Sequence, residues 1–180
     1  MNKTGSTAKN ETRKKENGCH VYKKCSGCSL RNMSYEEQLK FKYVKVDRLM
    51  GKLCRPDRVI GMTNTEGYRS KVQIAYDFVN GRAVSGIYRS ANGGVTAVNN
   101  CPVNDPRANR IGSAVLEAAR ELKIPVYCSG GGRGFLRHAL IRTAGNTDDI
   151  MCVIVGAARE FPEKKEFVRR LTKRCPEITS

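Results

Sequence analysis

The chain has 180 residues, and its 33 Lys and Arg residues against 17 acidic ones give a formal net charge of +16. This length fits one domain or two small ones. The charge favours polyanions as partners, nucleic acid first, because Lys and Arg release counterions from phosphates. There is no run of about 18 apolar residues and no apolar N-terminal leader. These features exclude a membrane-spanning helix, and we expect a cytoplasmic, monomeric protein with no membrane partner.

Residues 1–18 are polar and lack periodic apolar positions, which predicts a disordered basic tail. Residues 19–33 hold three cysteines and are predicted to form a loop. Ser34 with Glu37 then matches a capping box, and apolar residues follow at helical spacing. The pattern predicts a helix over 35–51.

A β-hairpin is predicted next. Apolar and polar residues alternate over 71–78, Asn80-Gly81 supplies a turn, and 83–88 forms the return strand. A short strand over 95–98 follows.

Asp105-Pro106 then opens a second helix, as cap and first-turn residue. The pattern recurs with strands over 135–143 and 150–157 and a helix over 162–173, which is expected to bury Phe167, Val168 and Leu171. We therefore predict an α+β fold of antiparallel hairpins with packed helices, in a pseudo-duplicated hairpin–helix layout, with a Cys-rich loop before it.

Cysteine spacing carries the clearest chemical signal. Cys19, Cys25 and Cys28 lie close together, and Cys101 stands far downstream in front of a proline. Four thiolates in a three-plus-one grouping are typical of iron–sulfur clusters. Structural zinc is the main rival, although zinc ribbons usually carry two CxxC pairs and only one is present. Unligated thiols remain a third reading.

The other four cysteines carry no such pattern. Cys152 is expected in a buried strand as a small hydrophobe, and Cys54, Cys128 and Cys175 are isolated in the sequence. No His or carboxylate pattern marks any of them as a nucleophile.

Two basic segments precede the predicted hairpins. Arg69 and Lys71 follow Tyr68, and Arg137 and His138 follow Phe135. Such residues grip phosphates and stack on splayed bases. The alternative is a charged strand edge that only discourages aggregation.

The glycine run at 129–134 does not match a phosphate-binding loop. It lacks the Gly-Lys-Ser/Thr ending, and a strand pattern follows it. We expect a flexible lead into the second hairpin.

Four blocks, in their order and spacing, resemble one family: CHVYKKCSGCSLRNMSYEEQLKFK, YRSKVQIAY, SGIYRS followed by VNNCPV, and GFLRHALIR. Over residues 19–180 the chain resembles the RumA/TrmA class of RNA (uracil-5-)-methyltransferases, the iron–sulfur type that acts on 23S ribosomal RNA. Such enzymes transfer a methyl group from S-adenosylmethionine to C5 of a uracil.

The resemblance implies a 4Fe–4S cluster on Cys19, Cys25, Cys28 and Cys101. It also implies ribosomal RNA as partner, with Arg69, Lys71, Arg137 and His138 in the basic blocks that bind it.

The resemblance also sets the expected domain organisation. Residues 19–175 would be an iron–sulfur RNA-binding central domain, and 176–180 the start of a linker. The family's S-adenosylmethionine site and catalytic residues lie in a C-terminal domain that this chain lacks, so no catalytic residue is expected here and the segment alone should be inactive. The competing hypotheses are a zinc-bound RNA-binding module without enzymatic activity and a small electron carrier.

Overall fold

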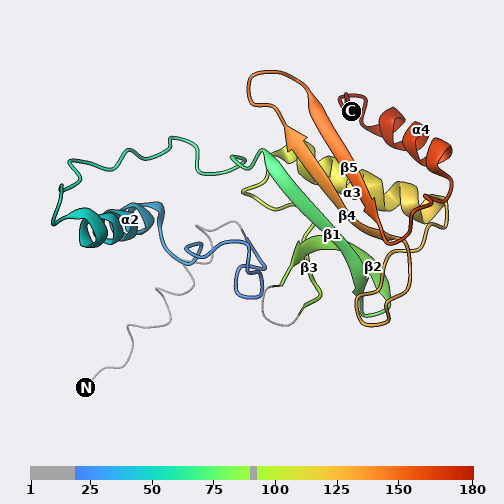
Figure 1. The fold of residues 1–180 in the computed structure, drawn as a ribbon, viewed down its shortest axis with the longest axis horizontal. Helices are drawn as coiled ribbons and strands as arrows, with labels where there is room; N and C mark the ends of the chain where they lie inside the picture. The colour runs from blue at the N-terminus through green and yellow to red at the C-terminus, as the bar shows by residue number, and fades with distance from the viewer. Residues whose placement is uncertain (1–18, 90–92) are drawn as a thin grey trace. The chain divides into compact units, whose positions relative to one another are not determined.

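The computed structural model describes residues 19–89 and 93–180 (Figure 1). The disordered tail predicted for residues 1–18 lies outside the described residues. In the described part, no helix has the length and apolar character needed to cross a bilayer.

The chain divides into two compact units. Among the described residues, the helical unit contains 19–22 and 28–65, and the sheet unit contains 23–27 and the chain from residue 66 onward. The short stretch 23–27 therefore belongs with the sheet although its neighbours on both sides belong to the helical unit.

The helical unit contains one long helix, α2 (Tyr35–Met50). The amide of Glu37 donates to the Ser34 hydroxyl over 3.2 Å, and the Ser34 amide donates to the Glu37 carboxylate over 2.8 Å. This reciprocal pair confirms the capping box, and it explains why the helix begins at Tyr35.

Two tyrosines tie the segment after α2 back to the helix. The amide of Met62 donates to the Tyr35 hydroxyl over 2.5 Å, and the Tyr43 hydroxyl donates to the carbonyl of Pro56 over 3.2 Å. No residue of α2 is buried, and Leu49 is 71% exposed. The apolar stripe predicted for this helix therefore builds no core within the helical unit.

The sheet unit is built on five antiparallel strands in the order β3-β2-β1-β4-β5. The strands are β1 (Lys71–Val79), β2 (Arg82–Tyr88), β3 (Val95–Ala97), β4 (Leu136–Thr143) and β5 (Ile150–Gly156). The predicted strands form, and the predicted α+β class is confirmed.

Asn80 and Gly81 both have positive φ, 52° and 74°, as the two-residue turn of the β1–β2 hairpin requires. The second hairpin, β4–β5, joins the first through pairing of β1 with β4. Each hairpin is followed by a helix, α3 (Pro106–Glu121) or α4 (Lys164–Arg174), with β3 preceding α3. This order agrees with the predicted repeated layout.

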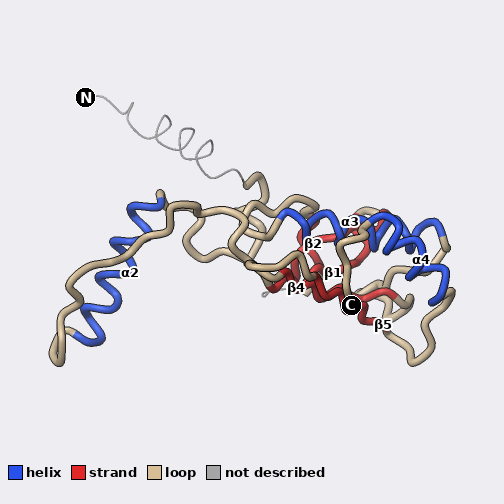
Figure 2. Tube along the Cα trace, turned by 90° about the horizontal axis from the view of Figure 1, so that it is seen from above, coloured by secondary structure: helices blue, strands red, loops and turns tan. Residues whose placement is uncertain are grey.

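Both helices lie on the same side of the sheet (Figure 2). Asp105 caps α3 by accepting from the Arg107 amide over 2.8 Å, and Pro106 occupies the first turn, as predicted. Gly112 allows α3 to approach the centre of the sheet, because a Cβ there would lie 2.1 Å from Cδ1 of Ile74. The core lies between α3, α4 and the strand face that they cover.

Two expectations for the C-terminal half need correction. Val168 is 48% exposed, so α4 buries only Phe167 and Leu171. Val153 of β5 is 41% exposed, because only one face of this strand meets the helices. Cys175, isolated in the sequence, is 1% exposed and belongs to the core cluster, which agrees with the structural role expected of it.

The glycine run forms a closed turn. The amide of Cys128 donates to the carbonyl of Arg133 over 2.7 Å, and the amide of Gly132 donates to the carbonyl of Cys128 over 2.9 Å. These backbone bonds close the segment into a turn before β4 begins, and its flexibility stays a prediction.

The end of the chain pairs with β5. The amide of Thr179 donates to the carbonyl of Ile150 over 2.9 Å, and the amide of Cys152 donates to the carbonyl of Ser180 over 2.7 Å. The residues predicted to begin a linker are thus held along the edge of the sheet.

Candidate nucleic-acid interface

The two faces of the sheet differ in what covers them. Val72, Ile74 and Tyr76 of β1 are buried on the helix side, and the Tyr76 hydroxyl donates to the α3 carbonyl of Gly112 over 3.0 Å. Because side chains alternate along a strand, the residues between them point to the opposite side. We call this opposite side the open face.

The strand register assigns the open face across four strands. Its members are Lys71, Gln73, Ala75 and the buried Asp77 on β1, Val84, Gly86 and Tyr88 on β2, His138, Leu140 and Arg142 on β4, and Met151, Val153 and Val155 on β5. In Figure 1, α3 runs behind the sheet, so the open face is turned toward the viewer. Basic, aromatic and apolar side chains are mixed on it, and no carboxylate is exposed among these members.

Two basic residues stand directly opposite each other on this face. Lys71 and Arg142 are Cα partners in the β1–β4 ladder, and both are exposed. Like charges in directly opposed positions destabilise a sheet. Within the described residues, neither side chain has an acidic partner. The pair forms an uncompensated positive site.

Two rings meet elsewhere on the open face. The ring centroids of Tyr88 and His138 lie 6.4 Å apart with planes at 79°, an edge-to-face contact. His138 is the Cα partner of Ala75, and Ala75 is the partner of Gly86. Because Ala75 and Gly86 carry almost no side chain, the rings of Tyr88 on β2 and His138 on β4 can approach each other across β1.

Arg137 precedes His138 at an irregularity in the β4–β5 register, which lies between Leu136 and His138. The Arg137 guanidinium carbon lies 4.2 Å from the ring centroid of Tyr127, a cation–π contact. This contact fixes the direction of an exposed cation.

The pKa values of His138 and Tyr88 reflect their burial and the nearby charge of Arg137. Burial, assisted by the nearby charge of Arg137, lowers the pKa of His138, which favours the neutral imidazole. The Nδ1 atom of His138 is buried and has no hydrogen-bond partner in the described residues. Burial raises the pKa of Tyr88, Arg137 opposes the shift, and Asp77 and Tyr127 add to it.

Arg69 has a different position from the other predicted RNA-binding residues. Its guanidinium donates to the carbonyl of Gly27 over 2.6 Å, and its amide donates to the carbonyl of Val103 over 2.9 Å. Arg69 therefore joins residues 23–27, which we call the Cys25 loop, to the segment after Cys101.

The structure places Lys71 and His138 on the open face and Arg137 at the register irregularity next to His138. Sequence reasoning missed Arg142 and Tyr88. The alternation of His138, Leu140 and Arg142 was a usable signal for Arg142, because strand residues two apart share a face. Tyr88 gave no signal of this kind, since its position depends on pairing between hairpins.

The cysteines of the predicted cluster belong to both units. Cys19 and Cys28 lie in the helical unit, and Cys25 and Cys101 lie in the sheet unit. In the described residues, no three Cys, His, Asp or Glu side chains form a group able to hold a metal ion. The predicted four-cysteine site therefore stays a prediction.

Within the sheet unit, side-chain hydrogen bonds connect the Cys25 loop to β2 and β3. The Thr96 hydroxyl donates to the carbonyl of Lys24 over 3.2 Å, and the Ser26 hydroxyl donates to the carbonyl of Tyr88 over 3.1 Å. The amide of Gly27 donates to Sγ of Cys25 over 3.4 Å. A backbone N–H directed at sulfur stabilises negative charge there, which suits a thiolate ligand.

Cys101 is 7% exposed and is clamped by α3. The side-chain amide of Asn109 donates to the carbonyl of Cys101 over 3.0 Å, and its oxygen accepts from the Cys101 amide over 3.4 Å. Because Arg69 binds both segments, Cys25 and Cys101 share a structural neighbour. Both are thiol side chains held at a fixed backbone by these hydrogen bonds.

Two of the remaining cysteines, Cys152 and Cys175, are poor nucleophiles because burial disfavours their thiolates. Burial raises the pKa of Cys152 to about 12, with a smaller contribution from Cys175, and burial also raises the pKa of Cys175. The expectation that Cys152 is buried is only partly met, because its side chain is half-buried at the core boundary.

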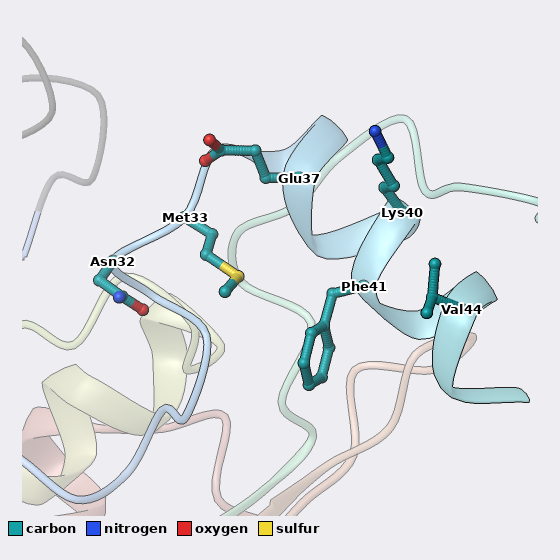
Figure 3. A pocket seen from close by; sticks show the side chains of 6 residues that line it. All are labelled: Asn32, Met33, Glu37, Lys40, Phe41 and Val44. Carbon is teal, nitrogen blue, oxygen red and sulfur yellow. The ribbon is translucent and has the colours of Figure 1, made fainter. Parts of the chain in front are cut away.

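A cavity of about 400 Å³ lies beside α2 in the helical unit (Figure 3). The side chains of Met33 and Phe41 face the same space, near Val44 and Lys40. Its one carboxylate, Glu37, is engaged in the capping box. The cavity therefore provides no acid–base pair.

Comparison with protein-family models found no match. The chain is similar to three curated proteins named uncharacterized RNA methyltransferases. It is 34% identical over 166 residues to one from Clostridium tetani, covering 90% of this chain and 36% of that protein. It is 37% identical over 161 residues to one from Clostridium acetobutylicum, covering 86% and 35%. For one from Oceanobacillus iheyensis, the identity is 32% over 178 residues, covering 96% and 38%.

The fold is similar to the crystal structure of Pyrococcus abyssi tRNA (uracil-54, C5)-methyltransferase in complex with S-adenosyl-L-homocysteine. The TM-score is 0.64 at 26% sequence identity, over 80% of this chain and 34% of that chain. The chain thus spans about a third of the length of the curated relatives and of the solved structure, and most of it is similar to proteins named RNA methyltransferases.

Proposed function

We propose that this chain is the RNA-binding segment of an S-adenosylmethionine-dependent RNA uracil-5 methyltransferase. Sequence similarity to RNA methyltransferases over 86–96% of the chain supports the enzyme class. The solved neighbour is a uracil C5 methyltransferase, which supports the uracil specificity. In this proposal, methyl transfer and S-adenosylmethionine binding belong to a part of the enzyme outside these 180 residues, and the segment alone is inactive and monomeric.

The single observation that carries the RNA-binding proposal is the Lys71–Arg142 pair. Its two cations stand opposite each other without an acidic partner in the described residues, on a face that the helices leave uncovered. The phosphates of RNA would relieve the repulsion that the fold retains. Arg137 would extend this positive site, and His138 lies on the same face. We propose that Arg69 contributes indirectly, by holding the Cys25 loop through Gly27.

The salt dependence of RNA binding tests this proposal. For a single-stranded RNA, Lys71→Gln with Arg142→Gln should reduce the slope of log Kobs against log salt by about 1.4, since each phosphate contact contributes about 0.7. The matched control is Lys164→Gln with Lys165→Gln on α4, which removes the same charge from the helix side. Equal effects of the two double variants would show that only overall charge matters.

We propose ribosomal RNA, 23S in particular, as the natural partner, on the resemblance of the four sequence blocks. The solved neighbour acts on tRNA, which makes tRNA the main alternative. Competition between deproteinised 23S ribosomal RNA and a tRNA pool for the full chain separates them. Preferential binding of tRNA would contradict the ribosomal assignment.

We further propose that Cys19, Cys25, Cys28 and Cys101 hold a 4Fe–4S cluster. The support is the attachment of the Cys25 loop, the N–H donated to Cys25 Sγ and the clamped, buried position of Cys101. The cluster would link the leading loop to the sheet, which is a structural role.

Metal and sulfide analysis after anaerobic purification and reconstitution tests the cluster. We expect iron, acid-labile sulfide and visible absorption, all lost in Cys101→Ser. Less than about one iron per chain would contradict the proposal, since a cubane needs four thiolate ligands. One zinc per chain in a colourless protein would favour the zinc-bound module instead.

A further inference from the structure

We infer that Tyr88 and His138 form a subsite for one unstacked RNA base on the open face. The inference rests on the proposed RNA-binding function and specifies what this face recognises beyond phosphate. Tyr88 was not among the residues that the sequence assigned to RNA.

The register brings the two rings together over residues with little or no side chain. The two rings stand on β2 and β4, and the intervening positions are Ala75 and Gly86. Tyr88 is 42% exposed, so its ring presents accessible aromatic surface on which a base can stack.

The hydrogen-bonding groups suit a base edge. His138 has an unpartnered, buried Nδ1, and its ring contacts the Tyr88 ring with centroids 6.4 Å apart. A neutral imidazole has one donor and one acceptor, which match the edges of an unpaired base.

Neighbouring groups place a cation at the edge of the subsite. The Arg137 guanidinium is held over the Tyr127 ring and is near enough to Tyr88 to affect its ionisation. Lys71 and Ala75 lie four residues apart on β1, which is about 13 Å along an extended strand. One single strand can therefore contact Lys71 and Arg142 with its phosphates and place a base at Tyr88.

The backbone of Tyr88 is also restrained. Its carbonyl accepts from the Ser26 hydroxyl over 3.1 Å, and it pairs with Val95 in β3. An aromatic ring on a fixed backbone loses little freedom when a base stacks on it.

Binding of a fluorescein-labelled single-stranded 12-nucleotide RNA to the full chain tests the subsite, with the same RNA annealed to its complement as the second probe. Tyr88→Ala should weaken single-strand binding about tenfold, or about 1.4 kcal/mol, and leave duplex binding within twofold. Tyr88→Phe, which keeps the ring, should bind like the wild type. His138→Ala should weaken single-strand binding about threefold.

Phe78→Ala is the matched control, because Phe78 is also an exposed aromatic residue in the sheet and lies outside the subsite. It should change neither affinity. A 2-aminopurine in the single strand should be quenched by the wild type and not by Tyr88→Ala, which reports stacking independently of affinity. Circular dichroism melting confirms that each variant is folded.

The outcomes separate this inference from the proposed function. If the wild type binds RNA and the Lys71/Arg142 variant lowers the salt slope, but Tyr88→Ala binds normally, only the base subsite is overturned. Equal weakening of single-strand and duplex binding by Tyr88→Ala also overturns it. If the wild type binds neither probe, the proposed function and the subsite fall together.

Discussion

Tyr76 and Gly112 join the central strand to the helix that covers it: the tyrosine hydroxyl donates to the glycine carbonyl over 3.0 Å. Tyr76 is 2% exposed, and burial raises its pKa well above the usual value. The contact requires close approach of α3 to β1, which Gly112 permits because it has no side chain.

Gly112→Ala should lower the free energy of unfolding by about 1–3 kcal/mol, because the added methyl overlaps Ile74 in a packed core. For a chain of this size, that corresponds to a fall in melting temperature of about 2–4 °C per kcal/mol. Thermal and urea unfolding measure it. Gly130→Ala is the control, since a Cβ at Gly130 meets nothing within 4 Å. Equal melting temperatures for the two variants would refute the packing argument.

Asp77→Ala should destabilise the protein by about 1–3 kcal/mol, because it removes a buried carboxylate that accepts three hydrogen bonds. Asp77 is 4% exposed and accepts from the Ser129 hydroxyl over 2.6 Å, the Ser129 amide over 3.2 Å and the Phe78 amide over 2.8 Å. Urea unfolding gives the size of the effect. Ser129→Ala removes one of these bonds and should cost less, and a larger loss in Ser129→Ala than in Asp77→Ala would count against this account.

The ionisation of His138 should make stability depend on pH. Its pKa in the folded protein is lowered by burial and by Arg137, so the unfolded chain takes up the proton first as pH falls. The free energy of unfolding should decrease as pH falls from about 7 through the unfolded pKa near 6.5, and level off below the folded pKa.

Urea unfolding between pH 5 and pH 8 checks this dependence, and His138→Gln should flatten it. Titration of the His138 ring protons by NMR, assigned with the same variant, measures the pKa directly. A His138 pKa at or above 6.5 in the folded protein would contradict the burial argument.

Cys152 should resist alkylation in the native protein. With its pKa raised to about 12 by burial, only about one molecule in 10⁴ carries a thiolate there at pH 8. Iodoacetamide followed by peptide mass spectrometry should label the exposed Cys54 first and label Cys152 and Cys175 only after unfolding in guanidinium. Native labelling of Cys152 as fast as Cys54 would show that the strand is open to reagent.

Local signals were sufficient where neighbouring residues decide the structure. Ser34 and Glu37 defined the start of α2, Asn80-Gly81 defined the first hairpin, and Asp105-Pro106 defined the start of α3. Capping and turn geometry depend on a few adjacent residues, so these elements could be predicted.

Burial was harder to predict. Val168 lies in the expected helix but is exposed, because it does not lie on the side of α4 that buries Phe167 and Leu171. The glycine run gave no signal for the closed turn or for the contact of Ser129 with the distant Asp77. In both cases the deciding contact involves residues far apart in the chain.

By itself, the sequence determined the α+β class, most element boundaries and the concentration of positive charge, because these follow from composition, periodicity and short-range capping. Only the tertiary structure decided that β1 pairs with β4, which sets Lys71 opposite Arg142 and brings His138 to Tyr88. Such pairings depend on how two hairpins separated by a helix align, and that alignment is fixed by packing of α3 against β1, β2 and β4 rather than by any local pattern.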